Sequence, residues 1–496
     1  MNTHVSDAVD PFEALLPEPT VATRVANQVG FAHYALDRMP LAQSVLLLWQ
    51  QVADPALLQD LFDRFRGRAY NKVLSFPTVV QLIADALLQH DGSARASFEG
   101  ALEHDALPVT IQAAYGKLRR LPIAVSTAFL TEGTQRLQEL LPATAANPLP
   151  RSVQSLTVTV LDGKTIKHVA KRLRLLRGVR GGIMGGKTLV ALECNNGLAV
   201  AMAAHPDGEI NELRLVPQLL PLLQQRQVSP RLWVGDRLYC DLEQTRRFTE
   251  ADGHFLVRYH PKVHFHADDQ RAVQHGCDGG GRAFCEEWGW LGSATDPRRR
   301  LVRRITLTRP GEEDLIVVTD LLNAHRYPAV DLLAVYHGRW GIEQVFQQVT
   351  EVFPLKRLIG STPQAGIFQM AFCLLLYNMI HVLRSYVACA EHWEPADISL
   401  EKLFEDVDKE LIAWTVLVDP MATVTVLGTI PTVAQARKQL TKLLSHVWQD
   451  RWLKTVNEKA RSYRRKPQAS RTHTSIHRIL EDHRRLVNQA KQKLIQ

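Results

Sequence analysis

Hydrophobic residues recur every three or four positions over residues 21–141, with proline or glycine between the repeats. This spacing is typical of amphipathic helices that bury one face. A Pro- and Ala-rich stretch follows at 142–152 and has the composition of a linker. We therefore predict a flexible lead over 1–20, an all-α domain over 21–145 and a domain boundary near residue 150.

The pattern changes after residue 155. The segment SLTVTVLDG (155–163) alternates as a strand does, and two more strands flank an Asn-Asn-Gly turn at 195–197. An amphipathic helix (209–225), a buried strand (231–236) and a second helix (241–251) come next, and then β-like segments up to residue 320. This order predicts an α/β domain over 150–390, built on a mixed sheet with an all-β insertion at about 250–322.

Helical spacing returns from Pro328, first over 329–353 and then in an apolar run over 365–383. The apolar run contains Gln369, Asn378 and His381, so it predicts a buried core helix rather than a membrane span. We expect a helical C-terminal region with a basic tail over 391–496.

Charge changes this picture, because it is unevenly spread. The net charge is +8, yet residues 451–496 hold 13 Lys/Arg against 3 Asp/Glu, which gives +10 and leaves −2 for the first 450 residues. A second basic block, Lys164 to Lys187, holds eight Lys/Arg and no acid. Such blocks favour a polyanionic partner, because each neutralised phosphate releases counterions. The alternative is a solvated tail and an ordinary surface loop.

Six cysteines in 496 residues are too few for a disulfide scaffold and indicate a reducing compartment. The first residues are acidic and lack the apolar stretch of a signal peptide. We expect a cytoplasmic location without a membrane segment.

Three acids stand where this architecture would use them. Asp162 ends the first strand, Asp236 ends the later buried strand, and Glu343 lies in the helix that follows the insertion. Carboxylates that converge at one sheet edge raise one another's pKa, and a hard divalent cation such as Mg²⁺ removes that penalty. Taken singly, an Asp here is also explained as a turn residue.

Tyr336, Arg339 and Glu343 follow one another at spacings of three and four, so they share one helix face. An Arg–Glu pair at this spacing is also common on helix surfaces, where it adds only a few tenths of a kcal/mol.

These residues resemble a known family. VTDLL followed by YHGRWGIEQVF is similar to the C-terminal signature Tyr-x2-Arg-x3-Glu-x6-Lys of bacterial insertion-sequence DDE transposases. The Leu-Asp-Gly at Asp162 and the Gly-Asp-Arg-x-Tyr at Asp236 look like the first and second acids of that family. The spacings of 74 and 107 residues also agree. The signature Lys is absent, because Thr350 occupies its position and Gln347 lies one turn earlier on the same face.

The resemblance implies an RNase H-like catalytic core and metal-dependent phosphoryl transfer. In that family water cuts the DNA at each element end, and the freed 3′-OH then attacks target DNA. By resemblance, Asp162, Asp236 and Glu343 are the catalytic residues and hold two Mg²⁺ ions, for which Mn²⁺ substitutes. Asp162 would bridge both ions.

The resemblance also implies double-stranded DNA as the partner, a synaptic homodimer and a nucleoid-associated location. Residues expected to contact DNA are Tyr336, Arg339, Lys164, Lys167, Arg237, Lys356 and Arg357. The N-terminal helices and the basic tail would help to bind the terminal repeats.

Several other interpretations remain open. Residues 181–188 match the P-loop pattern Gly-x4-Gly-Lys-Thr, but no helix is predicted after Lys187, as a P-loop requires. Trp288 and Trp290 are explained either by packing or by stacking on an unpaired base. Since the signature Lys is missing, a DNA-binding descendant that no longer cuts is a further alternative. A set of insertion residues could be scattered loop residues or a metal site: His264, His266, His275, Cys277 and Cys285.

Overall fold

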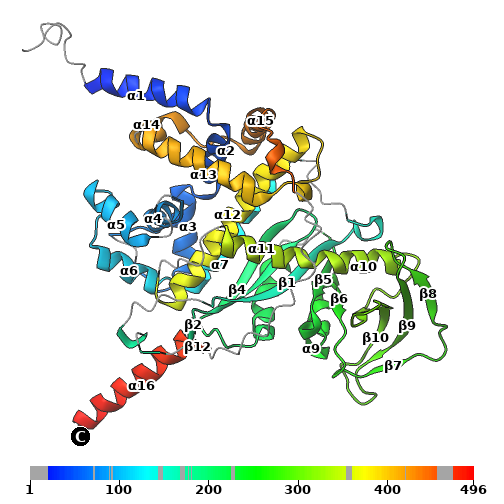
Figure 1. Cartoon of the computed structure of the whole chain (residues 1–496). Helices are drawn as coiled ribbons and strands as arrows, with labels where there is room; N and C mark the ends of the chain where they lie inside the picture. The colour runs from blue at the N-terminus through cyan, green and yellow to red at the C-terminus, as the bar shows by residue number, and fades with distance from the viewer. Residues whose placement is uncertain are drawn as a thin grey trace, which may run out of the picture.

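Figure 1 shows the computed structural model of the chain. It describes residues 21–70, 73–88, 90, 93–142, 149–167, 174–176, 178–179, 181–224, 229–352, 360–418, 420–454 and 473–495. The predicted lead over 1–20, most of the basic block after Lys167, the pair Lys356 and Arg357, and much of the basic tail lie outside the described residues.

The first region is helical, as predicted. Short polar residues cap several of its helices: Asp54 accepts the backbone N–H of Leu57, and Thr110 accepts that of Ala113. The helices are α1 (Val21–Leu36), α2 (Pro40–Val52), α3 (Pro55–Phe65), α4 (Phe76–Leu88), α5 (Ala94–Glu103), α6 (Ile111–Arg119) and α7 (Ile123–Leu140). The last of them packs on the sheet and joins the two regions into one hydrophobic core.

The predicted mixed sheet is confirmed. Its first five strands are β1 (Thr157–Thr165), β3 (Lys187–Glu193), β4 (Leu198–His205), β5 (Arg231–Gly235) and β6 (His254–Arg258), in the spatial order β4-β3-β1-β5-β6. Strands β4, β3 and β1 pair antiparallel, whereas β1, β5 and β6 run parallel. Every residue of β5 is buried, as expected for a parallel strand covered on both faces.

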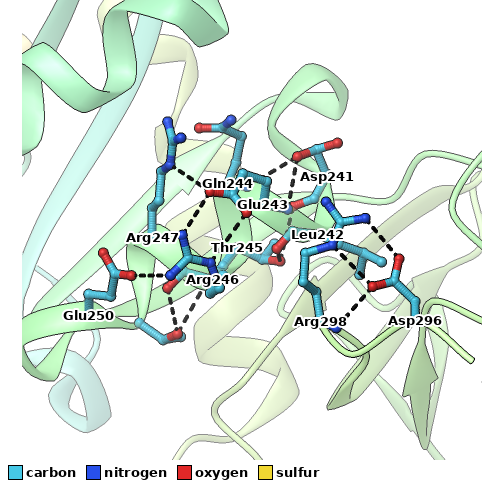
Figure 2. Close-up of polar contacts among 11 residues, drawn as sticks. Asp241, Leu242, Glu243, Gln244, Thr245, Arg246, Arg247, Glu250, Asp296 and Arg298 are labelled. Carbon is cyan, nitrogen blue, oxygen red and sulfur yellow. Dashed lines mark hydrogen bonds and ion pairs between the residues drawn. The ribbon is translucent and has the colours of Figure 1, made fainter.

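Helices α8 (Val216–Gln224) and α9 (Leu242–Phe248) make the crossovers from β4 to β5 and from β5 to β6. Figure 2 shows how polar contacts fix α9. Asp241 accepts the backbone N–H groups of Glu243 and Gln244, and Arg246 bridges Glu243 and Glu250. These contacts anchor the short helix that follows the turn at Asp236.

The predicted all-β segment is part of the same sheet. Its strand β11 pairs antiparallel with β6, so the sheet continues outward in the order β11-β10-β9-β7, with β8 also paired to β9. The outer strands are β7 (Phe265–Ala267), β8 (Gln274–Cys277), β9 (Ala283–Leu291), β10 (Arg300–Leu307) and β11 (Leu315–Thr319). The pairing assigns β6, which we had included in the insertion, to the parallel part of the sheet. Sequence pattern could not show this, because strand pairing is set by contacts between distant residues.

One long helix was expected over 329–353, and the structure contains two: α10 (Ala329–Gly338) and α11 (Trp340–Glu351). At the junction the N–H of Arg339 bonds to the carbonyl of Tyr336, and the N–H of Ile342 bonds to that of Arg339. These bonds span three residues instead of four, so the chain tightens at Arg339. The single-helix prediction was therefore wrong at this position.

The helices after them are α12 (Pro363–Ala390), α13 (Leu400–Leu417), α14 (Pro420–Leu427), α15 (Val433–Leu444) and α16 (Ile476–Ile495). Just before α16, β12 (His473–Ser475) pairs in parallel with β2 (Gly182–Met184). This pairing attaches the C-terminal segment to the basic block, and Figure 1 shows α16 in red beside it.

Within the described chain, α12 is the one helix long and apolar enough to cross a membrane, and its most apolar stretch is entirely buried inside the protein. Asn378 lies inside this helix with no exposed surface. Its side chain accepts the N–H of Ala199 at 2.9 Å and donates to the hydroxyl of Thr134 at 2.8 Å and the carbonyl of Ala199 at 2.9 Å. The predicted buried helix is confirmed, and its polar residue fixes α12 against α7 and β4.

Candidate active site

The parallel pairing of β1 with β5 brings two of the candidate acids together. Val160 lies opposite Val234, so the same register two residues later places Asp162 next to Asp236. Neighbouring strands are about 4.8 Å apart, and residues in register point to the same face. Asp236 accepts the backbone N–H of Leu238 at 2.8 Å, which fixes the turn after β5.

Asp162 carries a strongly perturbed carboxyl group. Burial, together with the negative charges of Glu212 and Asp236, raises its pKa to about 7, against the opposing effects of Arg339 and the N–H of Gly163. The ionised form is therefore disfavoured first by the loss of solvent and then by the neighbouring acids.

Glu212 is a fourth acid at this edge, which we did not predict. It is only 7% exposed, lies 3.4 Å from the Nζ of Lys187, and accepts the hydroxyl of Tyr239 at 3.2 Å. Its carboxylate packs directly over Gly163, where any Cβ would lie 1.7 Å from Oε2. Only glycine can therefore follow Asp162 with Glu212 in this position.

The third candidate acid approaches from the helices. Figure 1 shows α11 lying across β1, and the two elements are in contact. Arg339 is 8% exposed and donates to Glu343 Oε1 at 3.1 Å, and its guanidinium lies 5.9 Å from the ring centroid of Tyr336. Arg339 also acts electrostatically on Asp162. The predicted Tyr336–Arg339–Glu343 face is thus found together, and a buried cation lies between Glu343 and the sheet edge.

Tyr336 is nearly covered, with 4% of its surface exposed. Burial raises the pKa of its hydroxyl, Arg339 and Arg258 lower it, and Asp236 raises it. These interactions link the helix residue to the second acid as well.

The cations expected to contact DNA have different surroundings. Lys164 is half-buried with its Nζ 5.3 Å from the ring centroid of Phe346 on α11, and burial lowers its pKa. Lys167 is exposed. Arg237 forms an ion pair with Glu313 at 2.6 Å, so it is held against the β-rich segment.

Thr350, at the position of the missing signature Lys, donates its hydroxyl to the carbonyl of Phe346 at 2.6 Å. This bond lies within α11. Lys164 contacts the same turn of the helix from the strand.

The other interpretations are also tested by the structure. Lys187 begins strand β3 and pairs with Glu212, so the P-loop pattern is not followed by a helix and we reject that reading. Trp288 is 6% exposed and donates to the carbonyl of Leu322 at 2.9 Å, which is a packing role. Trp290 is 37% exposed and lies under the guanidinium of Arg299.

Within the described part of the chain, no three His, Cys, Asp or Glu side chains lie close enough to hold a metal ion together. The register of β1 and β5 brings Asp162 next to Asp236, and Arg339 connects Glu343 to them. The prediction that Asp162 ends its strand was wrong, because β1 continues to Thr165 in its pairing with β3.

The segment that carries this site matches a known family. Residues 154–379 match the family model described as Transposase DDE domain. All three candidate acids fall inside the match.

A curated relative in Sinorhizobium fredii, named "Putative transposase y4zB", is 23% identical over 155 residues, which is 31% of this chain and 43% of that protein. The match thus spans less than half the length of the relative. A solved structure, titled as a piggyBac transposase synaptic complex with hairpin DNA, gives a TM-score of 0.33 with 11% identity, over 84% of this chain and 78% of that one. The family match and the curated relative support a DDE transposase.

Proposed function

We propose that this protein is a DDE transposase that binds the terminal repeats of a mobile DNA element, cuts phosphodiester bonds at its ends and joins the 3′-OH ends to target DNA. The observation that carries the proposal is the placement of Asp162 on β1 beside Asp236 at the end of β5, inside a segment that matches the transposase DDE domain. The strand order β4-β3-β1-β5-β6, with its directions, supports an RNase H-like core over about 150–390.

The acids suit a divalent cation. Asp162 holds its proton up to about pH 7 because its carboxyl is buried beside other acids, and carboxylate oxygens are the ligands that Mg²⁺ prefers. Asp162, Asp236 and Glu343 would hold two Mg²⁺ ions, with Mn²⁺ as a substitute, once Glu343 leaves Arg339 and approaches the two aspartates, because the three acids do not lie together in the described structure. When bound, the ions would lower the pKa of a water and neutralise charge on the leaving oxygen.

The chain's own residues would position the DNA strand. Arg339 is buried, and its guanidinium can donate two parallel hydrogen bonds to a phosphate. Tyr336 lies beside this guanidinium. Lys164 and Lys167 follow Asp162 on the same strand and its continuation, so they would bind backbone phosphates next to the cut.

Double-stranded DNA would be the partner, and cutting two ends together would need a homodimer. The all-α region over 21–145 and the C-terminal region over 391–496 would contribute to binding the ends. The net charge of +10 over 451–496 supports this assignment.

A second candidate is a descendant that binds DNA without cutting it, which the presence of Thr350 in place of the signature Lys favours. Cleavage separates the two functions. Purified protein is incubated with Mg²⁺ or Mn²⁺ and a duplex carrying the element end, beside Glu343→Gln and a control, Glu405→Gln, which changes an exposed acid on α13.

Metal-dependent nicking by the wild type and Glu405→Gln, but not by Glu343→Gln, is the expected result. Binding without nicking in either metal would contradict the transposase assignment and support the DNA-binding descendant.

A further inference from the structure

A cationic groove lies between the end of α6, the start of α12 and the side of α16, and we call it the α12 groove. Its volume is about 860 Å³, and the residues that carry the argument are Arg119, Arg120, Thr362, Gln364, His483 and Arg484. No Asp or Glu is among the described residues that line it. Three guanidinium groups from two elements far apart in sequence therefore face one space without an acid in its lining.

Thr362 gives this groove a specific polar feature. It precedes α12 directly, is only 6% exposed, and its Oγ1 has no hydrogen-bond partner. A buried hydroxyl without a partner is unfavourable, and native proteins rarely keep one without a reason. Because Thr362 lines the groove, a ligand there would supply the missing acceptor.

The helix start adds to the same preference. No side chain caps α12, and Pro363 at its first position has no N–H. The N–H groups of Gln364 and Ala365 fall in the first turn, which has no intrahelical acceptor, and they carry the positive end of the helix dipole. A 28-residue helix with a free first turn, a free hydroxyl and nearby arginines has the composition of a phosphate site.

The groove lies close to the candidate active site. Ile166 follows Asp162 by four residues along β1 and its continuation, which spans about 13 Å. Ile166 in turn lies against Gly366, where an added Cβ would be 3.8 Å from Ile166 Cδ1. Thr362 is one helical turn before Gly366, about 5 Å further. Together with the Ile166 side chain and its contact with Gly366, these steps place the groove within about 27 Å of Asp162, or up to roughly eight base pairs at 3.4 Å each.

We propose that the α12 groove binds a backbone phosphate of the duplex whose scissile phosphate lies at Asp162, within about eight base pairs of the cut. This inference rests on the proposed function. A free phosphate or nucleotide would satisfy the same donors, but the neighbouring Lys164 and Lys167 extend the positive surface from the groove toward Asp162, as a polymer requires.

The first test measures duplex binding by fluorescence anisotropy in Ca²⁺, over a series of salt concentrations. The variants are Thr362→Val and the double change Arg119→Ala/Arg120→Ala. The matched control is Arg95→Ala/Arg298→Ala, which removes the same charge from exposed arginines paired with Glu99 and Asp296, the latter drawn in Figure 2.

The arginine pair is expected to lower the salt slope by about one unit, since the groove holds one phosphate and each phosphate contact contributes about 0.9. The control should change it by less than half a unit. Thr362→Val keeps the side-chain shape, so it should weaken binding several-fold without lowering the thermal unfolding temperature. A loss of thermal stability with unchanged affinity would assign Thr362 a purely structural role and overturn the proposal.

The second test distinguishes the source of the phosphate. Duplexes extend either about 3 or about 15 base pairs beyond the cut, on each side in turn, so that only the longer ones reach the groove. The variants should weaken binding of a longer duplex and leave the shorter ones unaffected. If the variants weaken binding of the short and long duplexes equally, the proposed position of the groove along the duplex is wrong. Stabilisation of wild type by millimolar inorganic phosphate or nucleotide, lost in Thr362→Val with duplex binding unchanged, would show a small-molecule site instead.

The two hypotheses fail differently. If wild type nicks DNA and the groove variants bind the duplex as well as wild type, the phosphate site in the groove is contradicted and the transposase assignment stands. Weakened duplex binding by the groove variants, with no nicking by wild type in either metal, would leave a DNA-binding groove on a protein that does not cut.

Discussion

Replacing Asp162 with Asn is expected to stabilise the folded protein even though it removes a proposed catalytic group. The carboxyl of Asp162 is buried beside Glu212 and Asp236, and its pKa is raised from an ordinary 3.8 to about 7. The folded state therefore resists ionisation of this group, and the unfolded chain does not. Asn keeps the shape and never ionises.

The sign and size follow from proton linkage. Below about pH 4 the Asp162 carboxyl is protonated in both the folded and the unfolded state, so it does not change the free energy of unfolding. Between about pH 4 and 7 only the unfolded state ionises, so the free energy of unfolding falls by about 1.4 kcal/mol per pH unit. A shift of about three units sets an upper value near 4 kcal/mol, which persists above pH 7. The free energy of unfolding of Asp162→Asn should therefore exceed that of wild type by an amount that grows between about pH 4 and 7.

Urea unfolding in metal-free buffer at pH 4.5, 6.0 and 7.5 measures this difference, followed by the combined fluorescence of the nine tryptophans. The control is Asp296→Asn. Arg298 lowers the pKa of the Asp296 carboxyl, so this change should destabilise the protein slightly above pH 4.

A stability gap between Asp162→Asn and wild type that does not change with pH would refute the assignment of the raised pKa. Destabilisation at pH 7.5 would refute it as well. Added Mg²⁺ should stabilise wild type and not Asp162→Asn, because the variant lacks the proposed ligand.

Three further outcomes are expected. Glu212→Gln removes a charge that raises the pKa of Asp162, so the pH at which metal-dependent nicking is half-maximal should fall, and an unchanged pH–rate profile would contradict this. Lys164→Met keeps the packing against α11 and removes the charge, so the salt slope of duplex binding should fall by about one unit, as measured by anisotropy. Asn378→Leu leaves the buried N–H of Ala199 without its side-chain acceptor, while the carbonyl of Ala199 keeps the hydroxyl of Thr134, so the free energy of unfolding should fall by about 1–3 kcal/mol in urea titrations.

Much of this fold follows from local pattern. The alternation in β1, the Asn-Asn-Gly hairpin and the short apolar run of β5 each predict the strands that form. Once β1 and β5 pair in parallel, Asp162 and Asp236 meet because their positions are in register, although Asp162 lies inside β1, which continues to Thr165. The break at Arg339 could not be foreseen in this way, because the apolar spacing continues without change through the junction. The attachment of the outer strands through β11 and β6 depends on pairing between segments about sixty residues apart.

The contact between Glu212 and Gly163 is not predicted by local sequence pattern, although the glycine itself is a sign of it. In the sequence it is one acid in an amphipathic stretch, and Asp162-Gly163 looks like an ordinary turn dipeptide. In the structure the carboxylate of Glu212 occupies the space a side chain at 163 would need, and Lys187 and Tyr239 hold it there. The glycine is thus explained by a partner 49 positions away rather than by a turn, since it lies inside β1. Glycine in a strand costs conformational entropy, so its presence beside a candidate catalytic acid is itself a sign that another group approaches the backbone closely.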